Sequence, residues 1–555
     1  MRMLKQLTLL EDEKKDVTNH IAESYTGIYA MHKYWSKKPY NIIRDFVLKY
    51  THKGEIVLDP FCGSGISITE SILTGRKAIG IDINPIAIFI AKQMINKIST
   101  KLVGEEFKKI ESEIKDEINS FYTVKRGEKS FVGTHFIWKG SMLTEVRYKK
   151  GGRRTRVTEP TDEDIKLASS FLYEKIPYYF PKSNFFHNSR INANREKHIY
   201  DLFTPRNLMG LSLLMDRIEK IKNDSVREFF KFCFTASVGQ ASKMVFVIKR
   251  RGKFNGKAEK TRKKEVGSWV IGYWIPKENF EINVWNCFEN RYKRIIRAKR
   301  TQENAHYSIQ EAEIFEELLD SKNLLLVNEP AQKILKEIPD NSVDYVITDP
   351  PHGNRQPYLE LSMMWNSWLK KEVDYESEIV VSESKDRNKD IHDYYRLLSE
   401  VFVEIERVLK PNHYFSLMFN SLDDETWMNL LQNMNNLNFK LKKVETLGYS
   451  ANSVVQDTRK AGLKTDFALT FEKIPNKSTK SIELISVKNN KDQIVNLVET
   501  CFDESGADGL YTYQILNFLV SKLLQQNKFF RLSEVLDILE MDFERKGNKF
   551  IRSEM

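Results

Sequence analysis

The sequence predicts a doubly wound α/β domain that is split by a long insertion and followed by a small helical module. One observation is a short apolar run, residues 55–58, that ends at Asp59 and leads into a glycine loop and a helical pattern. A second is another apolar run, residues 343–348, that ends at Asp349. Polar residues at the ends of buried strands are typical of the ligand-binding edge of such a sheet.

The first run, the glycine loop and the next strand form one predicted βαβ unit. Gly63 and Gly65 lack side chains where the backbone must turn tightly and let a ligand approach. The second strand, residues 77–81, ends at Asp82, where a doubly wound sheet offers a carboxylate to ribose hydroxyls. A tight turn beside an ordinary acidic residue is the plain alternative, and the ordered set of Asp59, two glycines and Asp82 makes it less favoured.

The segment from Val57 to Gly65, VLDPFCGSG, resembles the S-adenosylmethionine loop of DNA methyltransferases that methylate exocyclic amino groups. Upstream, residues 32–39, HKYWSKKP, are similar to the segment that closes over the methionine end of the cofactor in this family. The resemblance implies a class I methyltransferase fold with S-adenosylmethionine as the cofactor. It also implies a set of cofactor-binding residues: Trp35, Lys38, Pro39, Asp59, Pro60, Phe61, Gly63, Gly65, Asp82 and Asn84.

The segment Asp349-Pro350-Pro351-His352 resembles the catalytic segment of the same family. By that resemblance all four are candidate catalytic residues, and Asp349 and the following carbonyl accept hydrogen bonds from the target amino group. Such positioning can contribute roughly 7 to 11 kcal/mol. At the fourth position the family usually has an aromatic residue that stacks on the extruded base, and this chain has histidine instead.

Three residues are therefore considered for the base contact. His352 either contacts the base or is a hydrogen-bonded turn histidine. Tyr358 and Trp365 are candidates for the missing aromatic face, and the alternative for each is a place in a helix core.

Positive charge is concentrated in residues 141–300, which hold 35 Lys and Arg against 17 Asp and Glu, although the whole chain is only +11. Clustered cations supply the salt-dependent attraction to phosphates, so we interpret this window as a DNA-recognition region. Residues 147–156 have glycines between basic flanks and predict a β-hairpin or flexible arm. The candidate DNA-binding residues are Arg153, Arg154, Arg156, Lys249, Arg250 and Arg251.

Two further segments of the window have a predicted structure. Residues 267–274 alternate small, aromatic and apolar residues like a strand, and residues 291–300 predict a basic helix. The tryptophans of this region, Trp269, Trp274 and Trp285, could stack on bases, but core positions are favoured for them.

The remaining sheet strands are predicted after the insertion, and the helix before the fifth strand should end ahead of Pro411. The order of cofactor segment, insertion and catalytic segment resembles the α-type arrangement of the family. The predicted strands are 323–328, 343–348, 413–419, 439–447 and 465–471, with a helix over 394–409. The predicted domains are 1–100 (cofactor part), 101–322 (basic insertion), 323–475 (catalytic part) and 476–555 (a helical or winged-helix-like tail).

Composition excludes several classes. No apolar run approaches the roughly 18 residues of a membrane helix, and the N-terminus is charged rather than signal-like, so we expect a cytoplasmic protein. The four cysteines have no spacing typical of a zinc site or a disulfide framework, so no metal is predicted. None follows a proline, which excludes the Pro-Cys nucleophile of cytosine-C5 methyltransferases.

The resulting hypothesis is a DNA amino-methyltransferase that flips its target base, with adenine N6 favoured. Cytosine N4 remains open, as do an RNA guanine-N2 methyltransferase and a methyltransferase-derived binding protein that has lost catalysis. The expected partners are double-stranded DNA and a cognate restriction or defence-system protein, with no membrane association. The sequence leaves the recognition sequence and the oligomeric state open.

Overall fold

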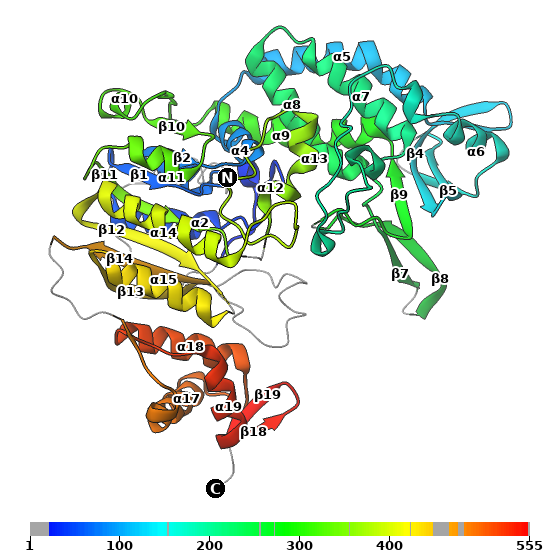
Figure 1. The fold of residues 1–555 in the computed structure, drawn as a ribbon. Helices are drawn as coiled ribbons and strands as arrows, with labels where there is room; N and C mark the ends of the chain where they lie inside the picture. Colours follow the sequence, from blue (N-terminus) through cyan, green and yellow to red (C-terminus); the bar gives the residue numbers. More distant parts are fainter. Residues whose placement is uncertain are drawn as a thin grey trace.

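A computed structural model describes the chain in three parts: a sheet domain, an insertion that extends to one side of it, and a C-terminal module below it (Figure 1). Within the described part of the chain, no helix is long and apolar enough to cross a membrane. The described residues are 22–151, 155–254, 257–270, 272–353, 356–421, 423–447, 466–475 and 482–552, and the side chains of residues 250–263 are not among them.

The central sheet has seven strands in the order β10-β2-β1-β11-β12-β14-β13. The first five are parallel, whereas β14 runs antiparallel to both β12 and β13. This arrangement confirms the predicted α/β class. The strands are β10 Leu324–Val327, β2 Lys77–Ile81, β1 Ile56–Asp59, β11 Val343–Thr348, β12 Leu409–Phe419, β14 Asp466–Lys473 and β13 Phe439–Leu447.

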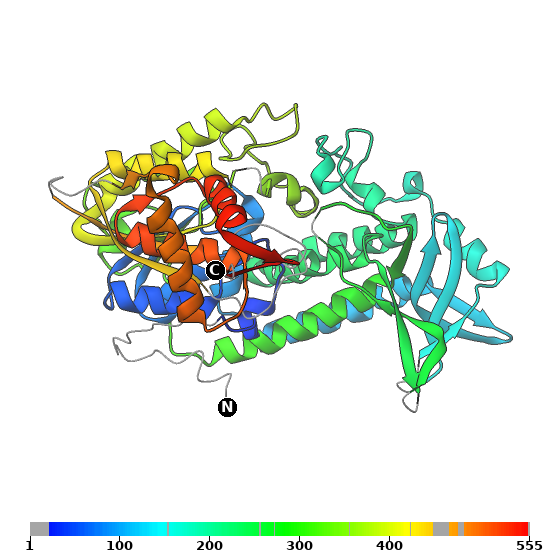
Figure 2. The same ribbon diagram turned by 90° about the horizontal axis from the view of Figure 1, so that it is seen from below.

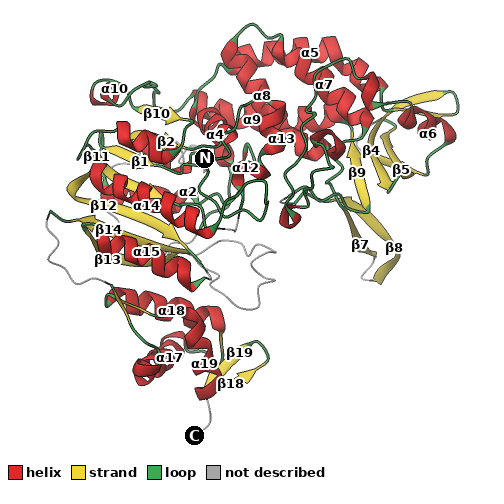
Figure 3. Ribbon diagram, in the orientation of Figure 1, coloured by secondary structure: helices red, strands yellow, loops and turns green. Residues whose placement is uncertain are grey.

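Helices cover both faces of this sheet (Figure 3). Successive residues of β11 point to opposite faces, so Tyr345 and Ile347 join the core beneath α2 and α4, and Val346 joins the core beneath α14 and α15. Both faces are therefore buried, as a parallel sheet requires. The helices are α2 Tyr40–Tyr50, α3 Ile66–Leu73, α4 Pro85–Ile95, α11 Ala331–Ile334, α14 Ile391–Val408 and α15 Asp424–Asn436.

The strand order places a crevice beside β1. The chain moves outward from β1 to β2, and it later returns on the other side of β1 with β11. Ligands bind at such a switch point, outside the carboxyl ends of the strands. Asp59 and the segment after Thr348 lie at this edge.

The insertion contains a helical bundle and a small sheet, and Figure 2 shows the bundle connecting that sheet to the main domain. Strand β9 returns from far along the chain to pair with β4. The helices are α5 Thr100–Ser120, α6 Asp162–Ser169, α7 Pro205–Glu219, α8 Asp224–Val238 and α9 Val284–Glu303. The strands are β3 Thr123–Arg126, β4 Lys129–Lys139, β5 Met142–Lys149, β6 Thr155–Thr158, β7 Val247–Phe254, β8 Lys257–Val266 and β9 Glu278–Ile282.

One prediction in the insertion is wrong: within the predicted strand 267–274, the described residues 267–270 and 272–274 form no strand. Trp269 and Tyr273 are buried, and the Lys33 ammonium donates a hydrogen bond to the Trp269 carbonyl at 2.9 Å. Gly272 has φ +91°, and a Cβ there would lie 2.9 Å from the Ile191 carbonyl oxygen. Tertiary packing of the aromatic side chains therefore overrides the alternating pattern.

The helix ends ahead of Pro411 as predicted, since α14 ends at Val408. The predicted start of the next strand is wrong, because β12 begins at Leu409 rather than at residue 413 and runs through the proline. Proline is tolerated here because the residues around it, Pro411 and Asn412, are exposed at the start of the strand.

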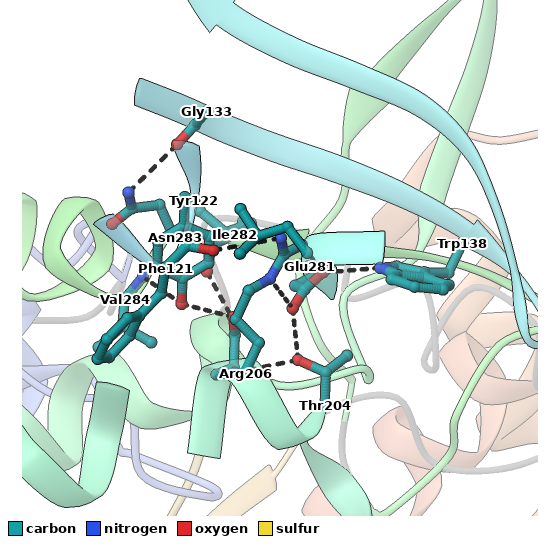
Figure 4. Close-up of polar contacts among 12 residues, drawn as sticks. Phe121, Tyr122, Gly133, Trp138, Thr204, Arg206, Glu281, Ile282, Asn283 and Val284 are labelled. Atoms are coloured by element: carbon teal, nitrogen blue, oxygen red, sulfur yellow. Dashed lines mark hydrogen bonds and ion pairs between the residues drawn. The ribbon is translucent and has the colours of Figure 1, made fainter. Parts of the chain in front are cut away.

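Part of the positive charge of the insertion is internal. Arg206, on α7, is buried against Glu281, on β9, and it donates hydrogen bonds to both carboxylate oxygens at 3.0 and 2.5 Å (Figure 4). Lys299, on α9, is also buried and donates to the carbonyls of Gln93 and Asn96, each at 2.5 Å. Arg206 holds the insertion together, whereas Lys299 ties α9 to the end of α4. Neither cation is available to a ligand.

The residues after the central sheet form three helices and a three-stranded antiparallel sheet in the order β16-β19-β18. The module contacts the sheet domain, since α18 packs on β13 and Asp424 of α15 accepts a hydrogen bond from Leu532 N at 2.6 Å. Its elements are β15 Glu483–Leu484, α17 Lys491–Ser505, β16 Leu510–Tyr511, α18 Thr512–Gln525, β17 Lys528–Phe529, α19 Leu532–Asp542, β18 Phe543–Lys546 and β19 Lys549–Arg552, of which β15 and β17 pair with each other. Residues 476–481, at the start of the predicted tail, lie outside the described residues.

Candidate cofactor and catalytic site

A pocket lies at the carboxyl edge of the sheet, where β1, β2 and β11 end. It brings together both predicted strand-end sites, which are almost 300 residues apart in the sequence. Of the predicted residues, Trp35, Lys38, Asp59, Pro60, Phe61, Gly63, Asp82, Asn84, Asp349 and Pro351 line it; Pro39, Gly65, Pro350 and His352 do not.

The loop after β1 depends on its two glycines for different reasons. Gly65 has φ +77°, and a Cβ there would lie 2.5 Å from the Cβ of Ala91 on α4. Gly63 has φ +51°, and its N–H donates to Asp82 Oδ2 at 2.8 Å. Gly65 therefore permits close packing of the loop against α4, while Gly63 faces the pocket and links β1 to the end of β2.

Asp59 connects the two halves of the site. Its carboxylate accepts hydrogen bonds from Phe61 N at 3.1 Å, from Thr348 Oγ1 at 2.7 Å and from the Ser67 hydroxyl. Burial raises the pKa of Asp59 to about 6, although these three donors oppose that shift. Because Thr348 immediately precedes Asp349, Asp59 fixes the end of β11 relative to the glycine loop after β1.

Asp82 is the second buried carboxylate of the pocket. Its oxygens accept from the N–H groups of Gly63 and Asn84, both at 2.8 Å. Burial raises its pKa to about 7, against the opposing effect of these hydrogen bonds. A carboxylate in this place suits ribose hydroxyls, and the neighbouring Ile83 and Ile379 suit an adenine ring, so the lining fits the nucleoside part of S-adenosylmethionine.

Two of the predicted cofactor residues take part mainly in packing. The Asn84 side chain is buried and bonds to Tyr34, Ser362 and Asn366. Trp35 stacks on Trp365, with ring centroids 5.3 Å apart. Both residues reach the pocket wall, but their polar or aromatic groups are largely directed into the protein.

Asp349 also lines the pocket and has partners on both carboxylate oxygens. Lys38 Nζ lies 2.9 Å from Oδ2, and His352 Nε2 lies 2.9 Å from Oδ1. The three side chains are only 11 to 15% exposed. Tyr394 donates to the Pro351 carbonyl at 2.7 Å and fixes the following backbone.

The structure separates the two aromatic candidates. Trp365 is 1% exposed and packs among His32, Trp35 and Trp269, so it is a core residue. Tyr358 lines the pocket, and its ring is nearly parallel to that of Tyr34 at a centroid distance of 6.2 Å.

Sequence reasoning missed several residues of the site. Tyr34 lies inside the HKYWSKKP segment and had a local signal. Glu378 and Asp466 had no such signal, because the first lies in an irregular segment and the second is a single acidic residue at the start of an apolar strand. Glu378 lines the pocket near Asp82, and Asp466 lies 2.6 Å from Lys38 Nζ.

Of the predicted DNA contacts, the structure describes the side chains of Arg156 and Lys249, and neither lines this pocket. Arg156 is exposed on β6, and Lys249, on β7, pairs with Glu278 at 2.5 Å. Arg153 and Arg154 lie outside the described residues, as do the side chains of Arg250 and Arg251. The tryptophans of the window differ: Trp269 and Trp285 are buried, whereas Trp274 is 42% exposed.

Comparison with known proteins points to one family. Residues 8–93 and 343–515 match the model of the N6_N4_Mtase family, which is described as DNA methylase. The two matching segments contain both halves of the pocket and leave out the insertion between them.

Two curated relatives and one solved structure are similar to parts of the chain. Type II methyltransferase M.MjaII of Methanocaldococcus jannaschii is 21% identical over 225 residues, which are 39% of each protein. Type II methyltransferase M2.LlaDCHI of Lactococcus lactis subsp. cremoris is 38% identical over 68 residues, or 12% of this chain and 25% of that protein. A structure described as a DNA modification methylase from Thermus thermophilus is 11% identical, with a TM-score of 0.17, over 30% of this chain and 60% of that one. The chain thus matches about two fifths of the length of the first of these relatives and a quarter of the second.

Proposed function

Since this chain carries a DNA methylase domain of the N6/N4 family, we propose that it transfers a methyl group from S-adenosylmethionine to an exocyclic amino group of a base in duplex DNA. The observation that carries the proposal is the meeting of Asp82 and Asp349 in one pocket, one suited to a nucleoside and the other to an amino group. Adenine N6 is the favoured acceptor, because by resemblance cytosine-N4 enzymes more often carry serine where this chain has Asp349.

The residues of the pocket have distinct tasks in this proposal. Asp82 would hold the ribose of the cofactor, and the loop after β1 would support it. When bound, S-adenosylmethionine supplies the methyl carbon, which bonds to the amino nitrogen while its bond to sulfur breaks and the electron pair stays on sulfur. Asp349 accepts a hydrogen bond from the amino group, directs the nitrogen lone pair and takes up the proton that the nitrogen loses. The target base must leave the helix to reach this depth.

The experiment that tests the function uses methyl-labelled S-adenosylmethionine with duplex DNA and, separately, tRNA. The modified nucleoside is identified by mass spectrometry after complete digestion. N6-methyladenine in DNA is the expected product, and N4-methylcytosine would keep the reaction class but change the base. Label only in N2-methylguanosine of RNA, or no transfer to any substrate, would overturn the proposal.

The DNA-binding surface that we propose includes the exposed side of α9. Figure 2 shows this helix running from the sheet domain to the insertion. Arg294, Arg297 and Arg300 are exposed there and form no ion pair with any residue that the structure describes. Helix α9 also packs against residues 27–30, which lead into the wall of the pocket. At 1.5 Å per residue the three arginines span about 9 Å, a length that suits neighbouring phosphates.

Changing Arg294, Arg297 and Arg300 together to glutamine is expected to weaken DNA binding and flatten its salt dependence. Each lost phosphate contact should lower the slope of log Kd against log salt by about 0.9, so this slope should be lower by up to about 2.7 in the triple variant. Fluorescence anisotropy across a salt series measures both quantities. The charge-matched control changes Lys101, Lys108 and Lys222, which are exposed on α5 and at the turn after α7. An equal loss in both variants would show that α9 is not a specific contact surface.

We also propose that this chain acts together with a partner protein. Both curated relatives are named as type II methyltransferases, a class named for restriction-modification, which favours a cognate restriction or defence-system protein as the partner of this chain.

A further inference from the structure

The side chain of Lys38 lies between two carboxylates. Its ammonium nitrogen is 2.9 Å from Asp349 Oδ2 and 2.6 Å from Asp466 Oδ2. All three side chains are at most 15% exposed. Lys38 was predicted as a cofactor-binding residue, but its charged group is directed at the catalytic carboxylate.

Asp466 is itself held in place by its surroundings. It is the first residue of β14, and the Asn420 side chain, just after β12, donates to its Oδ1 at 3.1 Å. Asp349 follows β11, the strand on the other side of β12. Lys38 therefore joins the ends of β11 and β14 to the segment that precedes α2, and Asn420 links the end of β12 to the same group through Asp466.

The contacts form one continuous chain from Asn420 through Asp466, Lys38 and Asp349 to His352. Each carboxylate oxygen of Asp349 has one partner, Lys38 on Oδ2 and His352 on Oδ1. A carboxylate offers about four lone-pair sites, so it can still accept from an amino group while both partners hold it. Its orientation is fixed from two sides before any substrate arrives.

The second carboxylate changes what Lys38 can do. A single buried lysine that faced Asp349 alone would form a tight pair with it, and the amino group would have to compete for that carboxylate. With Asp466 closer to the ammonium than Asp349, the lysine is shared, and the three groups together keep a formal charge of −1. Asp349 thus remains an acceptor.

We infer that Lys38 and Asp466 are positioning residues for methyl transfer. Lys38 holds Asp349 in the orientation that receives the target amino group, and Asp466 holds Lys38 so that it does not neutralise that carboxylate. This inference rests on the proposed function, because Asp349 is given its role there. It assigns a function to Asp466, which lies 428 residues from Lys38 in the sequence.

The test compares Asp466→Asn, Lys38→Met and the double variant in steady-state methylation. Because a misplacement of about 1 Å can cost about 10²-fold, each single variant should lower kcat by about 10- to 100-fold. The KM for S-adenosylmethionine should change less than about threefold. The double variant should be no slower than Lys38→Met, because both residues act through one contact. Lys38→Arg, which keeps the charge and the donors, should recover part of kcat.

The matched control is Glu472→Gln, which removes another carboxylate of β14 whose lysine partner, Lys442, lies 2.9 Å away. It should keep the wild-type kcat. A wild-type kcat in Asp466→Asn would overturn the inference, and so would additive losses in the double variant. If the variants raise the KM for S-adenosylmethionine and leave kcat unchanged, the inference is wrong and Lys38 is a cofactor-binding residue, as the sequence predicted.

The two proposals fail in different ways. If the wild-type protein methylates only RNA, the proposed substrate is wrong, and the same comparison of kcat on RNA still tests the positioning residues. If the wild-type protein transfers no methyl group at all, both the proposed function and the positioning roles of Lys38 and Asp466 are wrong. Cofactor binding by calorimetry shows that each variant is folded, and Lys38→Met decides the question if Asp466→Asn does not fold.

Discussion

Asp349→Ala is expected to lower kcat for methyl transfer by about 10²- to 10⁴-fold, the range that a positioned proton acceptor contributes. The variant loses the acceptor that orients the amino group, while Asp59 and Asp82 still hold the cofactor side of the pocket. Affinities for S-adenosylmethionine and for DNA should therefore stay within about threefold of the wild type. Methyl transfer under single-turnover conditions, with separate binding measurements, gives all three values.

The control for this variant is Asp340→Ala. Asp340 precedes the other end of β11, its side chain is 70% exposed, and it pairs with Arg407 at 2.5 Å. An exposed ion pair contributes about 0 to 1 kcal/mol, so this change should leave the reaction rate unchanged. Full activity of Asp349→Ala would remove the assigned catalytic role, and a loss of DNA affinity equal to the loss of rate would assign the residue to binding.

Glu281→Gln is expected to destabilise the insertion by about 3 to 5 kcal/mol, because it leaves a buried guanidinium without a carboxylate. Arg206 and Glu281 are 2 and 1% exposed, and the Arg206 guanidinium lies 4.1 Å from the centroid of the Phe136 ring. Trp138 Nε1 also donates to Glu281 at 2.7 Å, as Figure 4 shows. Denaturant unfolding, monitored by tryptophan fluorescence, measures the loss.

Two controls accompany this variant. Asp216→Asn removes an exposed ion pair on the same helix as Arg206, with Lys220 at 2.6 Å, and should cost less than about 1 kcal/mol. The double variant Arg206→Met with Glu281→Leu replaces the pair by apolar groups and should recover most of the loss. If Glu281→Gln is as stable as the wild type, the buried pair does not hold the insertion together.

The same pair has a defined pH dependence. Burial alone would raise the pKa of Glu281, but Arg206 and the other hydrogen-bond donors lower it below its usual value. A lowered pKa means that the stabilisation is fully present above the ordinary glutamate range and is lost as the pH falls through the lowered value. The difference in stability between wild type and Glu281→Gln should therefore be constant near neutral pH and shrink in acid.

Much of the fold and of the site follows from local sequence. The run from Ile56 to Gly65 encodes a buried strand and a glycine turn, and residues 343–349 encode a strand that ends in a carboxylate. Such signals depend on neighbours within about ten residues, so the sequence predicts them well. By contrast, the strand predicted from the alternating pattern is absent from the described residues 267–270 and 272–274, because Trp269 and Tyr273 are buried by tertiary packing that no local rule describes.

The sequence by itself determined the α/β class, the glycine loop with Asp59 and Asp82, and the strand that presents Asp349. Only the tertiary structure decided that Lys38 faces Asp349 and Asp466, that Trp365 is a core residue while Tyr358 lines the pocket, and that Arg206 and Lys299 are internal. The physical reason is the range of the interactions: strand and turn preferences act between near neighbours. Ion pairs and burial depend instead on which strand ends the sheet brings together from opposite ends of the chain.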